Sequence, residues 1–173
     1  MNKHIDLLTG TVTVERSPDA VGRTLHLVDI ENLSGGPAAP RHHHVDAWRQ
    51  YERRAELRAE DHVIIAACER VMSGLMFELP SYVSKHIARG ADGADRMLLE
   101  AGDPVWVASR FGRVVIGSGD HAFAPFGRTV QGLGTSVVVV SGVGHRSKDL
   151  VGEGFGVRAI DLWVPQDELG LIV

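Results

Sequence analysis

The sequence predicts an α/β fold in three layers, with a mostly parallel central sheet that is covered by helices on both faces. Several short segments are apolar throughout, which is typical of strands that are buried on both sides. They alternate with longer segments in which apolar residues recur every three or four positions, the spacing of a helix with one buried stripe. A chain of 173 residues is long enough for one such domain.

Residues 1–22 are expected to form an N-terminal arm, as a hairpin or an edge strand, ahead of a main domain at residues 23–173. The alternating sequence Thr11-Val12-Thr13-Val14 favours extended structure in the arm, and Ser17-Pro18-Asp19 is typical of a turn.

The first half of the main domain alternates between strands and helices. Residues 24–29 are an apolar run that ends in an acid, and a glycine-containing loop follows at residues 32–37. Residues 45–60 are predicted to be a helix, because inward-facing residues recur along them at helical spacing: Val45, Trp48, Tyr51 and Ala55. The remaining elements are a strand at 62–67, a short helix at 70–77 that stops before Pro80, and a strand at 82–87.

The second half continues the alternation. A helix is expected at residues 93–101, and Asp103-Pro104 begins another, with Asp as the N-cap and Pro at the first helical position. Residues 113–116 form a strand that leads into Gly117-Ser118-Gly119-Asp120. The remaining elements are a helix at 122–133 that Gly134 closes, a strand at 136–140, a helical turn at 147–151 and a strand at 157–161.

Four acids stand where a parallel sheet would bring them together. Asp29 and Asp120 end or follow strands, and ligands of such sheets bind beyond the carboxyl ends of the strands. Asp92 and Asp95 are three residues apart at a helix start, so one turn places them on the same face. Two carboxylates about 5 Å apart repel by about 3 kcal/mol at an effective dielectric of about 20. We therefore expect a cation among them, and oxygen-only ligands favour Mg²⁺ or Mn²⁺.

Three motifs resemble those of the NYN family of PIN-like ribonucleases: Val28-Asp29-Ile30-Glu31-Asn32, Gly90-Ala91-Asp92-Gly93-Ala94-Asp95 and Val115-Ile116-Gly117-Ser118-Gly119-Asp120-His121-Ala122-Phe123. They stand in the family's order within residues 24–161, and the Ser-Gly-Asp-x-x-Phe motif is the most specific of them. The resemblance implies a PIN-like fold and a metal-dependent endonuclease that hydrolyses RNA phosphodiester bonds. Its products would carry a 5′-phosphate and a 3′-hydroxyl if two cations take part.

Carried over by position, the resemblance makes Asp29, Asp95 and Asp120 the catalytic acids, which would bind Mg²⁺ or Mn²⁺ together with Asp92. Asn32 matches the Asn of the opening motif, and an amide there can orient a ligand carboxylate or a water. His121 is a second supporting residue, because it stands next to Asp120.

One departure from the family leaves two further interpretations open. Family members often carry a second acid two residues after the position of Asp120, and here that residue is Ala122. The number of bound ions is therefore open, and so is a catalytically weak or inactive module for RNA binding, regulation or assembly. A phosphoesterase acting on small molecules would use the same metal chemistry.

Arg89, Arg110 and Ser118 are the predicted substrate-binding residues, because they are expected to lie close to the acidic pocket. The run Arg41-His42-His43-His44 is interpreted as a solvated loop, since neighbouring histidines rarely share one metal.

Composition limits the function classes. A net charge of −4 argues against binding of nucleic acid by bulk positive charge. The single Cys68 excludes an internal disulfide and a cysteine-based zinc site. No apolar run approaches the ~18 residues of a membrane helix, and the first residues do not resemble a signal peptide. We expect a cytoplasmic protein with RNA as its partner and no membrane contact, and homo-oligomer formation stays open.

Overall fold

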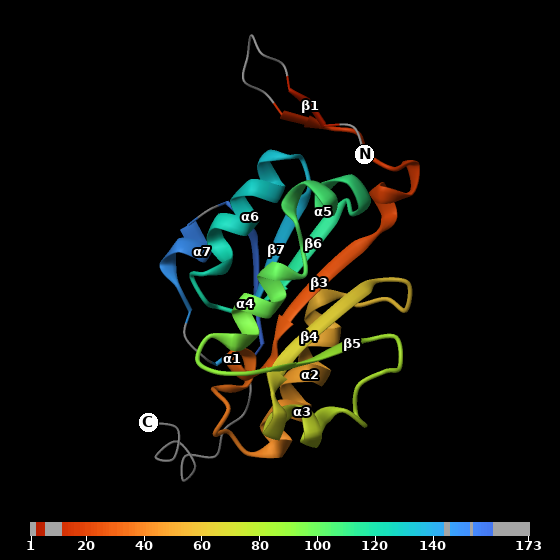
Figure 1. Ribbon diagram of the computed structural model, residues 1–173. Coiled ribbons are helices and arrows are strands. Elements are labelled where there is room, and N and C mark those ends of the chain that lie inside the picture. Colours follow the sequence, from red (N-terminus) through yellow and green to blue (C-terminus); the bar gives the residue numbers. More distant parts are fainter. Residues whose placement is uncertain (1–2, 6–11, 144–145, 153, 161–173) are drawn as a thin grey trace.

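A sheet of six parallel strands forms the centre of the computed structural model, which describes residues 3–5, 12–143, 146–152 and 154–160 (Figure 1). The strand order is β5-β4-β3-β6-β7-β8, and every neighbouring pair is parallel. The strands are β3 (Thr24–Asp29), β4 (His62–Cys68), β5 (Ser84–Ala88), β6 (Arg113–Gly117), β7 (Ser136–Ser141) and β8 (Gly156–Ala159). The predicted α/β class is confirmed.

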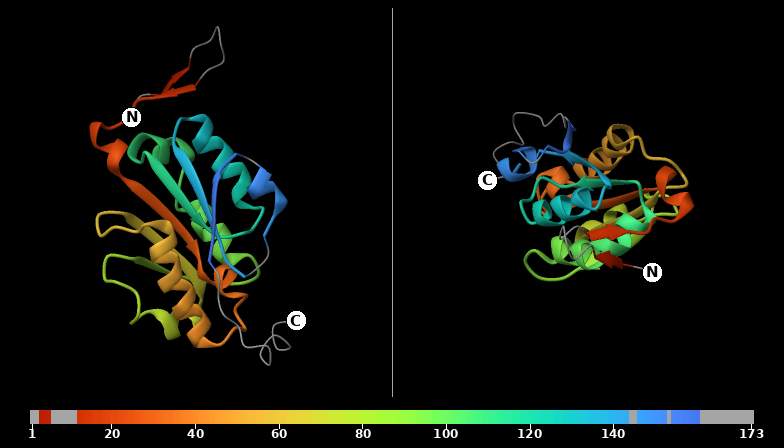
Figure 2. Two further views of the ribbon diagram at one scale, coloured as in Figure 1. Left: turned by 180° about the vertical axis from the view of Figure 1, so that it is seen from behind. Right: turned by 90° about the horizontal axis from the view of Figure 1, so that it is seen from above.

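Helices cover both faces of this sheet, which gives the three predicted layers (Figure 2). One face packs against α4 (Gly93–Glu100), α5 (Pro104–Arg110), α6 (Phe123–Gly132) and α7 (Lys148–Gly152). The other face packs against α1 (Ile30–Ser34), α2 (Arg41–Ala55) and α3 (Glu69–Leu75). None of the helices within the described residues has the length and apolar character needed to cross a membrane.

The strand order indicates where a ligand site would lie, because it reverses between β3 and β6. At such a reversal the loops after the two central strands leave toward opposite faces of the sheet, so a crevice opens between them. Val28 pairs with Gly117, so both strands end at the same level. The chain then continues from β3 into Asp29 and α1, and from β6 into Ser118, Gly119 and Asp120.

The N-terminal segment forms a second, two-stranded sheet and packs against α5. Strand β1 (Lys3–Ile5) pairs antiparallel with β2 (Val12–Val14), and the 3₁₀ helix η1 (Pro18–Gly22) leads into β3. Figure 1 shows this hairpin beyond the end of the sheet that is nearest α5. The predicted C-terminal part of the main domain, residues 161–173, lies outside the described residues.

Two local expectations are wrong. The loop predicted from residue 32 is partly helical, since α1 begins directly after Asp29. Gly35 is the C-cap of this helix, and its left-handed φ of 95° suits glycine. The run of histidines is not a solvated loop. Helix α2 begins at Arg41, directly after Pro40, so that His43 and His44 lie on its buried face. The Nδ1 atom of His44 lies 2.6 Å from the Ser34 hydroxyl, and this hydrogen bond joins α2 to α1.

Candidate functional site

Asp29 and Asp95 form a buried pair of carboxyl groups beneath the start of α4. Asp29 is 7% exposed and Asp95 is 9% exposed, and a side-chain hydrogen bond joins them. Asp29 is also the N-cap of α1, because its Oδ1 accepts hydrogen bonds from the backbone nitrogens of Glu31 at 3.0 Å and Asn32 at 3.1 Å. Asp95 lies in the first turn of α4, where the partial positive charge of the helix end favours a carboxylate.

The pair holds a proton near neutral pH. Burial is the main cause that raises the pKa of Asp29 to about 7, and the negative charges of Asp95 and Glu31 add to it. Burial also raises the pKa of Asp95 to about 6, followed by the charge of Asp120. The bond between the two acids raises the pKa of Asp29 and lowers that of Asp95. The two carboxyl groups therefore share a proton.

Asp120 approaches the pair from the loop after β6. Its Oδ1 accepts a hydrogen bond from the backbone nitrogen of Ala122 at 2.8 Å and lies 3.0 Å from Nδ1 of the exposed His121. The buried hydroxyl of Ser118 accepts from the backbone nitrogen of Asp120 at 3.1 Å. These contacts fix the loop, and they place the charge of Asp120 close enough to Asp95 to be its strongest charged neighbour.

Asn32 and Gly142 mark two close approaches to α1, one by the loop after β6 and one by the end of β7. The Asn32 Oδ1 accepts from the backbone nitrogen of Gly119 at 2.7 Å, so this oxygen supports the loop after β6, while Asn32 also lines the first of the cavities described below. On the opposite side, a Cβ at Gly142 would lie 2.0 Å from the carbonyl oxygen of Leu33, so only glycine allows the strand β7 end to pass α1.

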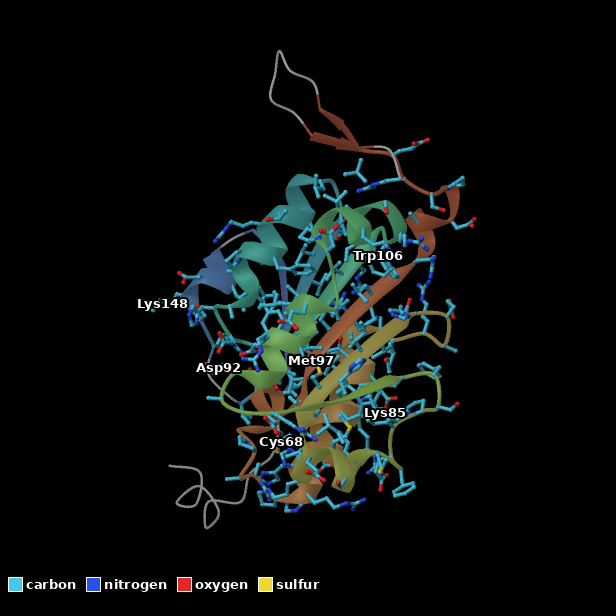
Figure 3. All side chains as sticks on the ribbon, viewed as in Figure 1. Cys68, Lys85, Asp92, Met97, Trp106 and Lys148 are labelled. Atoms are coloured by element: carbon cyan, nitrogen blue, oxygen red, sulfur yellow. The ribbon has the colours of Figure 1, made fainter. Side chains whose placement is uncertain are left out.

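Two cavities meet at the acids. The first, of about 340 Å³, is lined by Asp29, Glu31, Asn32, Cys68, Asp92 and Asp95, among others. The second, of about 580 Å³, shares Asp92 and Asp95 with the first and adds Asp120, His121, Arg96 and Leu99. Figure 3 shows Asp92 and Cys68 toward the sheet end that carries α1, whereas Trp106 lies toward the other end. Asp92 itself adopts a left-handed φ of 52°, which Asp and Asn tolerate better than most residues.

The acids suit a hard divalent cation in their chemistry. All four are oxygen donors, and the Oδ1 of Asp95 is buried without a hydrogen-bond partner among the described residues. A cation between Asp29 and Asp95 would replace their shared proton. Within the described part of the chain, however, no three His, Cys, Asp or Glu side chains already stand as a coordination group. Binding would therefore require the carboxylates to adjust.

The structure separates the predicted substrate-binding residues. Arg89 is exposed and stands between Ala88 and Gly90, which line the first cavity. Ser118 is fully buried, and its hydroxyl supports the Asp120 backbone. Arg110 lies at the end of α5, before β6 begins, and therefore at the opposite end of the sheet from the acids. Its guanidinium packs over Trp106, 5.4 Å from the ring centroid.

Three residues at the cavities were not predicted as site residues. Glu31 lines the first cavity, and its Oε1 accepts from the backbone nitrogen of Cys68 at 2.9 Å, which ties α1 to the end of β4. Burial and the neighbouring Glu31 raise the pKa of the Cys68 thiol. Arg96 lines the second cavity. Arg96 directly follows Asp95 in the sequence, and this position could have marked it as a site residue.

No family model, curated protein or solved structure matches this chain. The resemblance to the NYN family therefore stays a prediction that depends on the three motifs.

Proposed function

We propose that the protein is a metal-dependent ribonuclease that hydrolyses internal phosphodiester bonds of RNA. The observation that carries this proposal is the buried Asp29–Asp95 pair, in which two carboxyl groups of raised pKa are held together at the reversal of strand order. Burying such a pair is costly for folding, and perturbed acids of this kind cluster at functional sites. Asp120 and Asp92 border the same two cavities.

Asp29, Asp95, Asp92 and Asp120 would hold Mg²⁺ or Mn²⁺. When bound, such a cation neutralises charge on a phosphodiester and makes water a stronger nucleophile at neutral pH. The protein supplies the rest. The backbone N–H groups of α1 orient Asp29, the first turn of α4 orients Asp95, and the Asn32–Gly119 hydrogen bond keeps the Asp120 loop in place.

The exposed His121 can contact substrate. It stands 72% exposed at the second cavity, with Nδ1 turned to Asp120, so its other ring nitrogen is available to a phosphate oxygen. RNA is proposed as the substrate because of the three motifs, and a small phosphoester is the alternative substrate that a panel would test.

A non-catalytic module is the second candidate function. Local hydrogen bonds support it, because one oxygen of Asp29 and one of Asp120 each accept backbone N–H groups as in ordinary caps. Acids in this role would stabilise the fold without taking part in catalysis.

Cleavage of a labelled RNA pool in Mn²⁺, compared with EDTA, separates the two. Asp95→Asn and Asp120→Asn should each abolish cleavage while the proteins stay folded. Asp103→Asn is the matched control, because Asp103 caps α5 away from both acidic cavities and Asn keeps that cap. Cleavage that persists in either variant of the site would exclude these acids as the catalytic residues, and stabilisation by Mn²⁺ without any cleavage would favour the module.

A further inference from the structure

One stripe of helix α4 runs from the acids into the second cavity. Asp92, Asp95, Arg96, Leu99 and Glu100 all line that cavity. Their spacings of three and four residues place them on one face of the helix. The stripe is acidic at its start, and it passes through the partly buried Leu99 before it reaches the exposed Glu100.

The opposite wall begins with the carboxylate of Asp120 and becomes apolar at Ala122. The partly buried Ala122 follows His121 on that side. The small methyl group of Ala122 and the side chain of Leu99 give the cavity an apolar part, whereas Arg96 and His121 are exposed. Binding cavities for small flat molecules usually combine an apolar interior with a few polar groups in this way.

The charges of the cavity disfavour an anionic occupant. Four carboxyl groups line it (Asp92, Asp95, Glu100 and Asp120) against the guanidinium of Arg96 and the imidazole of His121. A phosphate would be repelled there as long as no cation neutralises the carboxylates. A nucleobase is neutral, offers a flat apolar face to Leu99 and Ala122, and carries donors and acceptors at its edge for Arg96 and the carboxylates.

We propose that this second cavity is a nucleobase-binding pocket, which holds the base of a nucleotide adjoining the bond that is cleaved. The proposal depends on the proposed ribonuclease activity for its biological role, because Asp92 and Asp95 belong to both cavities. Its physical content, the binding of a neutral base between α4 and Ala122, is measurable without catalysis.

Neutral nucleosides test the pocket directly. Methyl NMR of the full chain in EDTA would be recorded during titration with adenosine, cytidine and uridine, with ribose as the control for the sugar. At least one nucleoside should give saturable shifts of the Leu99 and Ala122 methyl signals, and ribose should give none. An absence of saturable shifts with all three nucleosides, or equal shifts with ribose, would overturn the proposal.

Variants then locate the base. Ala122→Leu fills the cavity and should weaken nucleoside affinity by about tenfold or more, whereas Ala59→Leu, the same change at an exposed turn, should not alter it. Arg96→Gln at the exposed rim is the second variant, matched by Arg53→Gln on α2. Arg96→Gln should weaken nucleoside binding by about fivefold, and Arg53→Gln should leave it unchanged. Unchanged affinity in both pocket variants would reject the location.

The two proposals fail separately. Nucleoside binding without RNA cleavage would support the nucleobase pocket and reject the proposed ribonuclease activity. If RNA is cleaved, sequencing of the products should show a base preference at one position beside the cleaved bond, and Ala122→Leu should weaken that preference. Cleavage with the same base preference in Ala122→Leu would support the ribonuclease activity and reject the nucleobase pocket.

Discussion

The side-chain oxygen of Asn32 accepts a hydrogen bond from the backbone nitrogen of Gly119 at 2.7 Å, across 87 residues of sequence. It joins the helix after β3 to the loop after β6, and so fixes the first acid, Asp29, relative to Asp120. The geometry of the site depends on this contact between α1 and the loop after β6, which lie on opposite sides of the strand reversal.

Asn32→Ala should therefore damage both stability and the site. Loss of a partner for the buried Gly119 N–H should cost about 1–3 kcal/mol in the free energy of unfolding. Asn32→Asp keeps an acceptor oxygen and should lose less. Urea unfolding measures the stability, and RNA cleavage measures the site. Equal stability of the Ala and Asp variants would argue against a supporting role of this hydrogen bond.

Gly117 should tolerate no side chain. A Cβ there would lie 2.7 Å from Cε2 of Tyr51, whose ring is fully buried and whose hydroxyl lies 2.8 Å from Nδ1 of His26. Gly117→Ala should destabilise by about 1–3 kcal/mol through overpacking. Gly22→Ala is the control, because nothing lies within 4 Å of its Cβ position. Thermal unfolding of both variants checks this, and similar melting temperatures would contradict it.

Stability without metal should depend on pH through the acid pair. The folded-state pKa values of Asp29 (about 7) and Asp95 (about 6) exceed the ordinary value of 3.8. Between pH 3.8 and about 7, the folded state therefore binds more protons than the unfolded state. The contribution of the pair to the free energy of unfolding is lost as pH rises through this range.

His26 acts in the opposite direction, because burial lowers its pKa from 6.5 to about 4, so its contribution is lost as pH falls. Both the wild-type protein and Asp95→Asn contain His26, so the contribution of His26 cancels when their free energies of unfolding are compared. In EDTA, Asp95→Asn should be more stable above about pH 6, by roughly 1–3 kcal/mol, and the difference should shrink toward pH 4. A variant that is less stable than wild type at pH 8 would contradict the buried-pair interpretation.

Mn²⁺ should stabilise the wild-type protein by about 2.7 kcal/mol at a hundredfold excess over its Kd. The stabilisation should be larger at pH 8 than at pH 5.5, because the cation competes with the proton shared by Asp29 and Asp95. Asp95→Asn should abolish most of it, and Asp103→Asn should leave it intact. Scanning calorimetry in Mn²⁺ and in EDTA gives these values. Equal stabilisation of wild type and Asp95→Asn would place the ion elsewhere.

The sequence predicted the sheet well because parallel strands that are covered on both faces are apolar throughout, and residues 63–67 and 137–140 have that pattern. It also predicted which acids share an edge, since strand direction alone places Asp29 and Asp120 together. The same rule applied to Arg110 would have shown that a residue before β6 lies at the opposite edge.

Other features could not be predicted from pattern. The burial of His43 and His44 depends on α2 starting at Arg41, four residues before its apolar stripe begins. The use of the Asn32 oxygen as a support for Gly119 depends on how closely two loops approach, which motif spacing does not specify. The hydrogen bond between Asp29 and Asp95 likewise depends on the packing of α4 over β3 and β4.

A crystal of the protein soaked in Mn²⁺, measured for anomalous scattering, tests the central claim most directly. A manganese peak in contact with the carboxylates of Asp29 and Asp95, with Asp120 or Asp92 completing the ligands, is the predicted result. A crystal that shows no manganese at this pair, with Asp29 still bonded to Asp95 at pH 8, would contradict it.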